Sequence, residues 1–570
     1  MQDRLRENTA VHVAGAGADR RFGTRRHGTG RPCRRYREPR SLSTWTESSQ
    51  GTSTMKTTWI LTTGLIAAQL ASVFAGASVL PAGATGPVRS RLIILADMGN
   101  EPDEEQQMAH MLVNCNEFDL EGLIAVTGKY LRPEAKQPYR RRLHPELFHR
   151  LIDAYAKVLP NLKLHAPNWP EADYLHSIVR AGQTGYGIAA TGPGKSSPGS
   201  KLILEALAKN DPRPIWIVVN AGANTLAQAL IDYRASHTPA EVEAIVAKLR
   251  VFENGAQDNS GAWICAQFPN IHWIRSNYQT YAYGGPGGRD GNTRVNLGPH
   301  FWKPYPYSPE GQHAWLKEHV RTGHGALGEL YPERRFGNGR LGFMEGGGTV
   351  PWLGLVNKGL FDINHPSWGG WSGRFTANKV ANVWSRHRDI KPDEEKVAPF
   401  YVYREVSDVW TNPDTGEVLH GDYVPVWRWR PAMYANEICR FDWCVQPFNK
   451  ANHHPVAAFN GDPGDTIVRL TAKPGEKVAL DASASTDPDG DKLVFHWWQY
   501  EEAGTYPGRV FIDGANTPKA TAHIPTGAGG KQIHLILEVR DQNPIASLHD
   551  YRRVVVDVEP DIIDSGATQE

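Results

Sequence analysis

The chain is short of several residue classes, and each shortage excludes a class of protein. Five cysteines in 570 residues are too few for a disulfide framework, and their spacing matches no zinc site. Excess charge of either sign is missing too: 62 lysines and arginines against 61 aspartates and glutamates give +1, so bulk electrostatics favours neither nucleic acid nor an anionic membrane as a partner. What remains is an ordinary globular balance, 40% apolar and 22% charged, enough for a large core and about two to four domains.

The first 54 residues lack the apolar content of a folded domain. Residues 1–40 are dense in arginine and hold few apolar side chains, so they cannot bury enough surface to fold. A basic arm for nucleic acid is the alternative that this composition offers. We expect residues 1–54 to be a disordered, non-native upstream extension, because a better translation start follows at Met55.

A hydrophobic run long enough to span a membrane is missing as well. The stretch MKTTWILTTGLIAAQLASVFAGASVLPAGATG, from Met55, has one lysine, then an apolar run from Trp59 to Phe74, then small residues. This is the three-part layout of a secretory signal peptide, and a single-pass anchor is the alternative. We expect a signal peptide over residues 55–85 and a secreted or periplasmic protein with no stable membrane span after cleavage.

Residues 89–360 alternate between strand-like and helix-like segments. LIILAD, LEGLIAVTG and PIWIVVNAG are apolar runs typical of buried strands, and amphipathic stretches such as EEQQMAHMLVNCNEF follow them. This alternation predicts an α/β domain with a mostly parallel sheet and helices on both faces. Ligands bind such sheets at the carboxyl ends of the strands. Four polar residues fall at or just after strand ends and predict one pocket there: Asp97, Thr127, Asn220 and Glu253.

The remaining chain divides into two parts. Residues 361–452 are rich in Trp and Arg and predict an irregular extension packed on the main domain, whose tryptophans either stack on sugars in a cleft or belong to the core. Residues 453–560 show short alternating strands with regular turn signals, which predict an all-β, Ig-like sandwich. Within it, DPDGD at residues 487–491 is either a calcium loop or a polar turn. Cys439 and Cys444 are either a small disulfide loop or two free buried thiols.

The acidic stretch LADMGNEPDEEQQ, Leu95 to Gln107, is the strongest candidate for a site. Carboxylates crowded at a strand end repel one another unless a hard cation such as Ca²⁺ neutralises them. A bound cation also makes a water easier to deprotonate, and Asp97 is placed to be both ligand and base. The alternative is that Glu101 to Glu105 form a charged first helical turn, which suits the helix dipole.

LIILADMGNEPDEEQ resembles the Asp-rich N-terminal motif of the nucleoside hydrolases, with two residues inserted before the acidic pair. Together with NEFDLEGLIAVTG, VVNAGANTLAQAL, QDNSGAWICAQFP, HGALGELYP and WRWRPAMYANEICRFDWC, it resembles a narrower group. That group is the cellulose-binding, nucleoside-hydrolase-like proteins of polysaccharide-degrading bacteria, which carry a C-terminal β-sandwich. The resemblance covers about residues 89–560.

The resemblance implies roles for individual residues. Asp97 matches the aspartate that is metal ligand and base, Asp103 the catalytic-site aspartate that contacts sugar hydroxyls, and Glu104 the second metal aspartate. Asn220 and Ala221 lie near the position whose backbone carbonyl binds the metal. The late metal aspartate has no match in FMEGGGTVPW, where Glu345 is the nearby acid. The base-recognition histidine has only His324 as a weak counterpart.

Further side chains are candidates for substrate contact, each with a plainer alternative. Lys129 follows the second strand and could equally be a solvated lysine. Asp258 and Asn259, with Gln257, lie in a loop that could bind sugar hydroxyls or form an Asx turn. Trp352 could be a sugar platform or a core residue. Asn100 in the acidic loop and Asn224 at a helix start complete the predicted substrate-binding set.

Three functions remain open on this basis. The first is a secreted, Ca²⁺-dependent hydrolase of glycosidic bonds in plant or algal carbohydrate. The second is a polysaccharide-binding protein with a degenerate active site, which the change to Glu104 and the missing late aspartate favour. The third is a secreted nucleoside hydrolase. None of the three involves nucleic acid as a partner.

Overall fold

The computed structural model describes residues 89–284, 309–335, 337–342, 347–356, 359–385, 395, 399–411, 416 and 418–561. The expectations for residues 1–54, for the signal peptide and for Glu345 lie outside these residues. Among the residues described, none of the helices has both the length and the apolar character needed to span a bilayer.

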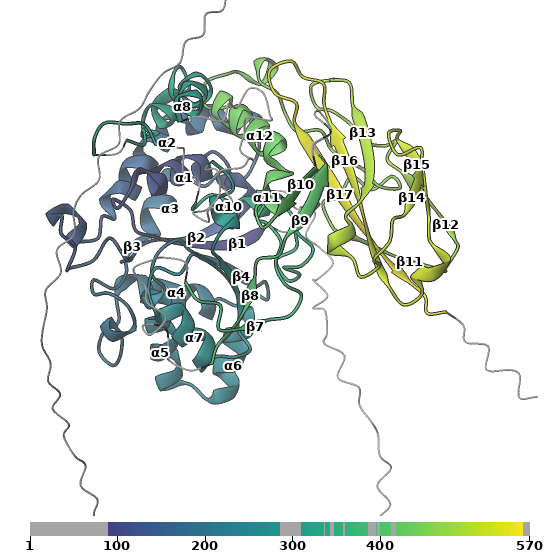
Figure 1. Cartoon of the computed structure of the whole chain (residues 1–570). Coiled ribbons are helices and arrows are strands. Elements are labelled where there is room, and N and C mark those ends of the chain that lie inside the picture. Colours follow the sequence, from purple (N-terminus) through teal and green to yellow (C-terminus); the bar gives the residue numbers. More distant parts are fainter. Residues whose placement is uncertain are drawn as a thin grey trace, which may run out of the picture. The chain divides into compact units, whose positions relative to one another are not determined.

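A central sheet of eight strands organises the larger part of the described chain (Figure 1). Its spatial order is β3-β2-β1-β4-β5-β6-β8-β7, and every neighbouring pair is parallel except β7 with β8. The strands are β1 Ser90–Ala96, β2 Phe118–Ala125, β3 Val179–Ala181, β4 Ile215–Val219, β5 Leu249–Asn254, β6 His272–Ser276, β7 Val380–Ala381 and β8 Tyr401–Arg404. The prediction of a mostly parallel sheet is confirmed.

Helices cover both faces of this sheet, as the strand–helix alternation predicts (Figure 1). Along β1, Leu92 and Ile94 belong to one core cluster and Ile93 and Leu95 to the other, so both faces of the strand are buried. The helices are α1 Pro102–Leu112, α2 Glu146–His165, α3 Ala172–Ser177, α4 Pro198–Ala208, α5 Asn224–Ser236, α6 Pro239–Lys248, α7 Ser260–Gln267, α8 Pro309–Leu316, α9 Gly325–Glu329, α10 Val350–Leu353, α11 Val424–Trp427 and α12 Arg430–Asp442. Buried residues of α1, α2 and α12 belong to the first cluster, and those of α4 to α7 to the second.

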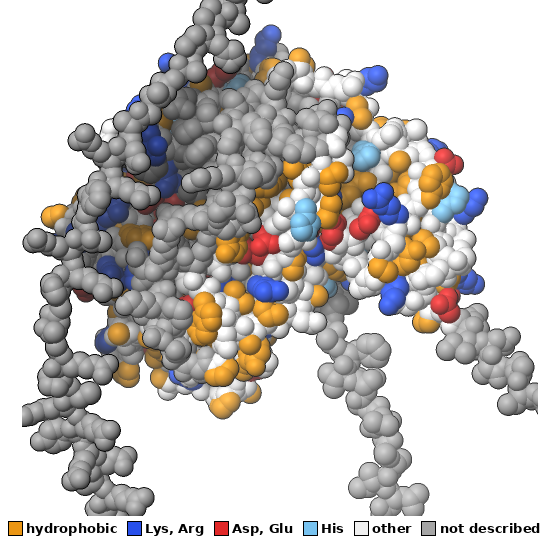
Figure 2. Space-filling model, viewed as in Figure 1, with side chains coloured by type: hydrophobic (Ala, Val, Ile, Leu, Met, Phe, Trp, Pro, Cys, Tyr) orange, Lys and Arg blue, Asp and Glu red, His pale blue; other side chains and the backbone are white. Residues whose placement is uncertain are grey.

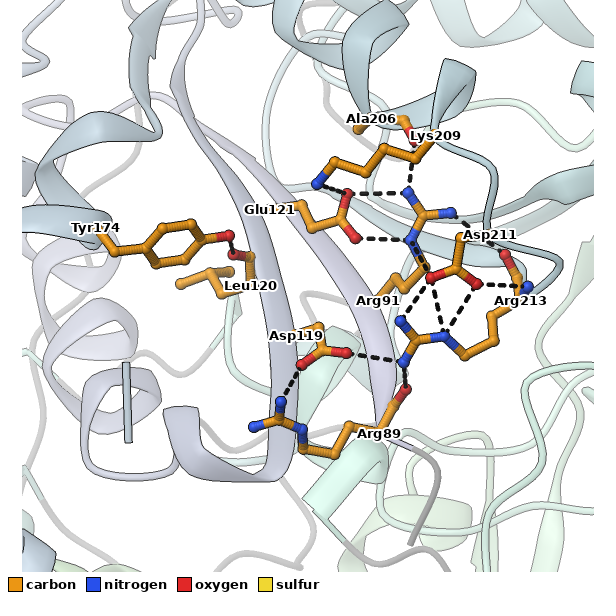
Figure 3. Close-up of polar contacts among 10 residues, drawn as sticks. All are labelled: Arg89, Arg91, Asp119, Leu120, Glu121, Tyr174, Ala206, Lys209, Asp211 and Arg213. Atoms are coloured by element: carbon orange, nitrogen blue, oxygen red, sulfur yellow. Dashed lines mark hydrogen bonds and ion pairs between the residues drawn. The ribbon is translucent and has the colours of Figure 1, made fainter. Parts of the chain in front are cut away.

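Charges at the amino ends of the first strands are paired with one another (Figure 3). Arg91 of β1 is fully buried and donates from Nε to Glu121 Oε1 at 2.6 Å. The Glu121 carboxylate also accepts from Lys209 Nζ at 3.0 Å, and Arg213 pairs with Asp119 at 2.7 Å. The pKa of Glu121 is held below its ordinary value, since these bonds outweigh the opposing effect of burial. The acids Asp119 and Glu121 at this edge of the sheet therefore each have a basic partner.

The Trp-rich segment after residue 360 contributes to the main sheet and core. Strand β8 pairs with β6, and α12 packs into the first core cluster. Four of its tryptophans are buried, which agrees with the core interpretation rather than with a cleft: Trp368, Trp371, Trp427 and Trp429. Cys439 and Cys444 are free and buried, and the Cys439 thiol donates to the Asn452 carbonyl.

The C-terminal part has two sheets around a third core cluster. Their orders are β11-β17-β16-β13 and β12-β15-β14, with only β11–β17 parallel, which agrees with a β-sandwich. The DPDGD stretch forms a turn in which Asp487 Oδ1 accepts from the amides of Asp489 and Asp491, and Gly490 has a φ of +80°. The strands are β11 Val468–Ala472, β12 Lys477–Asp481, β13 Val494–Gln499, β14 Phe511–Asp513, β15 Lys519–His523, β16 Gln532–Arg540 and β17 His549–Val558, and the preceding hairpin is β9 Asp408–Thr411 with β10 Val418–Gly421.

One buried arginine joins the sandwich to the segment at residues 359–369. Arg553 of β17 donates from Nε to the Leu360 carbonyl at 2.8 Å and from Nη2 to the Gly369 carbonyl at 2.9 Å. Its Nη1 lies 2.9 Å from His534 Nδ1, and its backbone amide donates to the Gly359 carbonyl. Because all of these groups are away from water, each needs the arginine as a partner.

We predict that Arg553→Met destabilises the protein. Methionine fills the stem but leaves two buried carbonyls without donors, which costs about 3 kcal/mol of unfolding free energy. Thermal unfolding should show a melting temperature several degrees lower. Arg509→Met is the matched control, since Arg509 is 89% exposed and should leave the melting temperature unchanged. An unchanged melting temperature in Arg553→Met would contradict the role given to this contact.

Candidate functional site

The ends of three adjacent strands meet at the carboxyl edge of the sheet. Beyond β1 the backbone pairing continues, because Val126 N donates to Ala96 O at 3.0 Å and Asn220 N to Leu95 O at 2.9 Å. The residues that follow β1, β2 and β4 are therefore neighbours. The structure brings together Asp97 and Asn220 of the predicted pocket at this edge, as parallel strands require.

A tight turn connects β1 to α1 and carries the acidic stretch. Asn100 N donates to Asp97 O at 3.0 Å, and Gly99 between them has a φ of +88°, which favours glycine. Helix α1 then begins at Pro102 with acids throughout its first turn. The first helical turn is charged, as one interpretation of the acidic stretch predicts, but Asp97 and Glu104 are only 2% and 4% exposed.

Amide side chains surround the carboxylate of Glu104. Its Oε2 accepts from Gln107 Nε2 at 3.3 Å and from Asn220 Nδ2 at 3.4 Å. Gln107 is in turn oriented by the Trp352 indole, which donates to Gln107 Oε1 at 3.1 Å. Trp352 is completely buried, so its indole packs in the core and offers no face to a sugar. It positions Glu104 through Gln107, a connection that links α10 to α1.

The carboxyl groups of this turn carry unbalanced negative charge. Burial is the main cause that raises the pKa of Asp97 and of Glu104 well above their ordinary values, and repulsion from the neighbouring carboxylates adds to it. The half-buried Asp103 has its pKa raised to about 6 by burial, against the opposing effect of Arg334, which pairs with Glu101 at 2.5 Å. Among the described residues, neither Asp97 nor Glu104 forms an ion pair.

Several oxygens of the site are buried and lack a hydrogen-bond partner among the described residues. They are Asp97 Oδ2, Asn100 Oδ1 and Asn220 Oδ1. A buried polar atom without a partner calls for an explanation, such as a water or a bound ion, and three such oxygens gather at this turn. Carboxylate and amide oxygens are the donors that Ca²⁺ prefers, so the donor chemistry fits the predicted cation.

The carboxylates alone do not complete a coordination sphere. In the described part of the chain, no group of three or more His, Cys, Asp or Glu side chains is arranged to hold a metal ion. Amide oxygens would have to contribute, as the unpartnered Asn220 Oδ1 can. The carbonyl of Asn220 is already engaged, since Gln257 Nε2 donates to it at 3.2 Å, and Ala221 beside it is fully buried.

A second group of predicted residues borders Asp97. A Cβ added to Gly128 would lie 2.5 Å from Gln257 Oε1 and 2.9 Å from Asp97 Oδ2, so only glycine allows this approach. Lys129 is 8% exposed, and its amide donates to Gln257 Oε1 at 3.1 Å. Its ammonium lies 5.8 Å from the centroid of the Tyr186 ring. Lys129 is thus beside the pocket and largely buried, rather than a solvated lysine.

Other predicted substrate contacts hold loops in place. Asn224 Nδ2 donates to the Gly185 carbonyl at 2.8 Å, and Asn259 Oδ1 accepts from Ile188 N at 2.9 Å. Asp258, whose pKa burial raises to about 7, accepts from the amides of Ala223 and Ser260 through Oδ1 and from the Ser260 hydroxyl through Oδ2. These bonds favour the turn interpretation for Asp258.

Two residues lie outside the acidic pocket. Glu253 was expected in it, but Arg275 Nε donates to its Oε2 at 2.7 Å and the Trp273 indole donates at 2.8 Å. Its carboxylate is therefore already paired inside the core, although burial still raises its pKa. His324 Nε2 lies 3.0 Å from Asp442 Oδ1 of α12. This contact gives no support to the expected role of His324 in recognising a nucleoside base.

Sequence analysis missed Gln107 and Gly128 as parts of the site. The paired glutamines that end the acidic stretch are a signal that could have shown Gln107, because amides buried beside carboxylates act as donors. Gly128 directly follows a strand whose end faces the pocket, where close approach of two chains requires glycine.

A parallel α/β sheet with an acidic turn after its first strand agrees with the resemblance to nucleoside-hydrolase-like proteins. Residues 91–375 match the model of the family described as cellulose-binding Sde182, nucleoside hydrolase-like domain. Residues 477–558 match the C-terminal domain of the cellulose-binding protein Sde0182. The chain belongs to this family, and the resemblance found in the sequence is confirmed.

One solved structure agrees with this assignment. A nucleoside hydrolase-related hypothetical protein from Saccharophagus degradans, associated with carbohydrate metabolism, is 35% identical, with a TM-score of 0.69 over 83% of this chain and 100% of that chain. The effector protein XOO4466 is 15% identical over 43% of this chain and 64% of that chain, with a TM-score of 0.23. No curated protein matches the chain.

We predict that Glu104→Gln stabilises the Ca²⁺-free protein at neutral and alkaline pH. The raised pKa means that the folded chain keeps this proton where the unfolded chain has lost it. The unfolding free energy therefore falls as the pH rises above the ordinary value of 4.5. In chelator, the variant should melt several degrees higher than wild type at pH 8 and about equally at pH 4.5.

The control for this variant is Glu134→Gln, which removes an exposed glutamate. It should leave both melting temperatures unchanged. A Glu104→Gln protein that melts lower than wild type at pH 8 would show that the Glu104 carboxylate is not under electrostatic strain.

Proposed function

We propose that the protein is a secreted, Ca²⁺-dependent hydrolase of glycosidic bonds in plant or algal polysaccharide. The observation that supports it best is the set of buried oxygens without partners at Asp97, Asn100 and Asn220, beside the unpaired carboxylate of Glu104. The cellulose-binding family and the relative associated with carbohydrate metabolism support the substrate class. A polymer outside the cell also fits the signal peptide expected over residues 55–85.

Each residue of the site has a chemical part in this proposal. Asp97, Glu104 and the Asn220 side chain would hold the cation. Bound there, Ca²⁺ would neutralise the cluster and make a nearby water easier to deprotonate. Asp97 would take a proton from the water that attacks the anomeric carbon. The leaving sugar oxygen would take a proton from solvent as the glycosidic bond breaks with oxocarbenium-ion character. Asp103, at the start of α1, would accept hydrogen bonds from sugar hydroxyls.

The second candidate function is polysaccharide binding without catalysis. Its support is the lack, among the described residues, of three metal-ligating acids in one group, together with the glutamate at position 104. A longer side chain in place of aspartate changes the position of the charge by one methylene. A secreted nucleoside hydrolase is the third candidate, supported by the acidic turn alone.

We predict that Asp97→Asn abolishes turnover. The amide keeps the shape but cannot accept the proton, so the rate of glycan cleavage should fall at least about 100-fold. Reducing-end release from a panel of plant and algal polysaccharides and from nucleosides measures this, with Ca²⁺ content determined in parallel. Asp153→Asn is the control, because the Asp153 side chain is 69% exposed on α2.

Three outcomes separate the candidates. Glycan cleavage lost only in Asp97→Asn supports the hydrolase. Polysaccharide binding with no cleavage by wild type contradicts it and favours the binding protein. Cleavage of nucleosides alone favours the third candidate.

A further inference from the structure

An exposed aromatic ring lies against the acidic turn. Tyr139 belongs to the one-turn helix Pro138–Arg141, within the long connection from β2 to α2, and is 50% exposed. A Cβ placed on Gly99 would lie 2.9 Å from His144 Cδ2 and 3.2 Å from Tyr139 Cε1. The edge of the Tyr139 ring therefore contacts the same turn whose two ends are Asp97 and Asn100.

The position of this ring is fixed from beneath by a buried histidine. The Tyr139 and His144 rings are stacked, with centroids 3.9 Å apart and planes inclined by 23°. His144 is fully buried, and both of its nitrogens are bonded: Nδ1 lies 2.8 Å from Glu146 Oε1 and Nε2 lies 2.7 Å from the Tyr139 carbonyl. One face of the tyrosine is covered by this stack, and no other ring or cation among the described residues stacks on it.

The surrounding connection is tied down by its own backbone. Arg132 N donates to Arg140 O at 2.9 Å, and Arg141 Nε donates to Ala135 O at 2.8 Å. The connection is joined to the site at its start, where Gly128 N donates to Leu131 O. A ring held in this way loses little conformational entropy when a ligand covers it, so binding there is pre-organised.

A half-exposed tyrosine ring that is held in place beside the acidic turn suits a sugar ring. The C–H groups on one face of a pyranose are apolar and pack on aromatic rings, while the hydroxyls at its edge find charged partners. Here the ion pair of Arg142 with Glu146 at 3.1 Å supplies polar groups next to the ring. A nucleoside has no second sugar to place there.

We propose that Tyr139 forms a second sugar subsite, which stacks a pyranose of a β-linked glucan whose neighbouring residue occupies the acidic pocket. This inference rests on the proposed function, because it assumes that carbohydrate binds at Asp97. It goes further by making the ligand a chain of at least two sugars. The same subsite serves a soluble oligosaccharide or a single chain of insoluble cellulose.

The test compares ligands of different length. Affinities for methyl β-D-glucoside and for cellotetraose are measured by calorimetry in Ca²⁺, and depletion by insoluble cellulose is measured alongside. Tyr139→Ala should weaken cellotetraose binding about threefold to tenfold and leave the monosaccharide unaffected. Tyr139→Phe, which keeps the ring and its stack on His144, should bind like wild type. Phe511→Ala, at a 65% exposed aromatic of the sandwich, is the matched control and should also bind like wild type.

The outcomes separate the subsite from the site. Equal cellotetraose affinity in wild type and Tyr139→Ala overturns the subsite and leaves the hydrolase proposal standing. Loss of affinity for both ligands in Tyr139→Ala with an unchanged melting temperature also overturns it, since the effect is then not confined to the second sugar. If wild type binds no cellotetraose, the glucan subsite is overturned. The hydrolase proposal is then tested separately, by comparing the cleavage of other glycans by wild type and Asp97→Asn. Reduced depletion by cellulose without reduced cellotetraose affinity would assign the ring to a polymer surface and overturn the proposal as stated.

Discussion

The structure depends on one unbalanced feature: buried carboxylates gathered at the carboxyl edge of a parallel sheet. Parallel strands place all their following loops at one edge, so Asp97 after β1 and Asn220 after β4 become neighbours. At the opposite edge the acids Asp119 and Glu121 are paired with arginine and lysine. At the carboxyl edge Asp97 and Glu104 have only amide partners among the described residues. Acids with basic partners at one edge of the sheet and acids with only amide partners at the other distinguish the candidate site from the rest of the sheet.

The rest of the fold keeps that charge in place. Helices on both faces exclude water from the strand ends, and burial is the main cause of the raised pKa values there. Trp352 holds Gln107, and Gln107 donates to Glu104, so the core itself orients the carboxylate. Such an arrangement costs folding stability in the absence of a cation, a trade commonly found at functional sites. On the face seen in Figure 2, by comparison, acidic and basic side chains of the described residues are interspersed.

Much of the fold follows from local sequence pattern, because buried parallel strands are continuous apolar runs. LIILAD and PIWIVVNAG predict β1 and β4, and the polar residues that follow them predict the edge where Asp97 and Asn220 meet. Contacts between residues that are distant in sequence could not be predicted from local sequence pattern. Glu253 belongs to a pair with Arg275, which also contacts Glu395, and no local signal reveals this. Trp352 and four of the later tryptophans, Trp368, Trp371, Trp427 and Trp429, could be sugar platforms or core residues, and only tertiary packing decides that they are buried.

The most direct measurement is anomalous diffraction from crystals grown with a calcium surrogate such as Mn²⁺. If the unbalanced oxygens are a cation site, one strong anomalous peak should lie within coordination distance of Asp97, Glu104 and Asn220. No peak there at saturating metal, with the carboxyls of Asp97 and Glu104 hydrogen-bonded within the protein, would contradict the account. The acidic turn would then be a relic, and the function would have to rest on polysaccharide binding elsewhere on the protein.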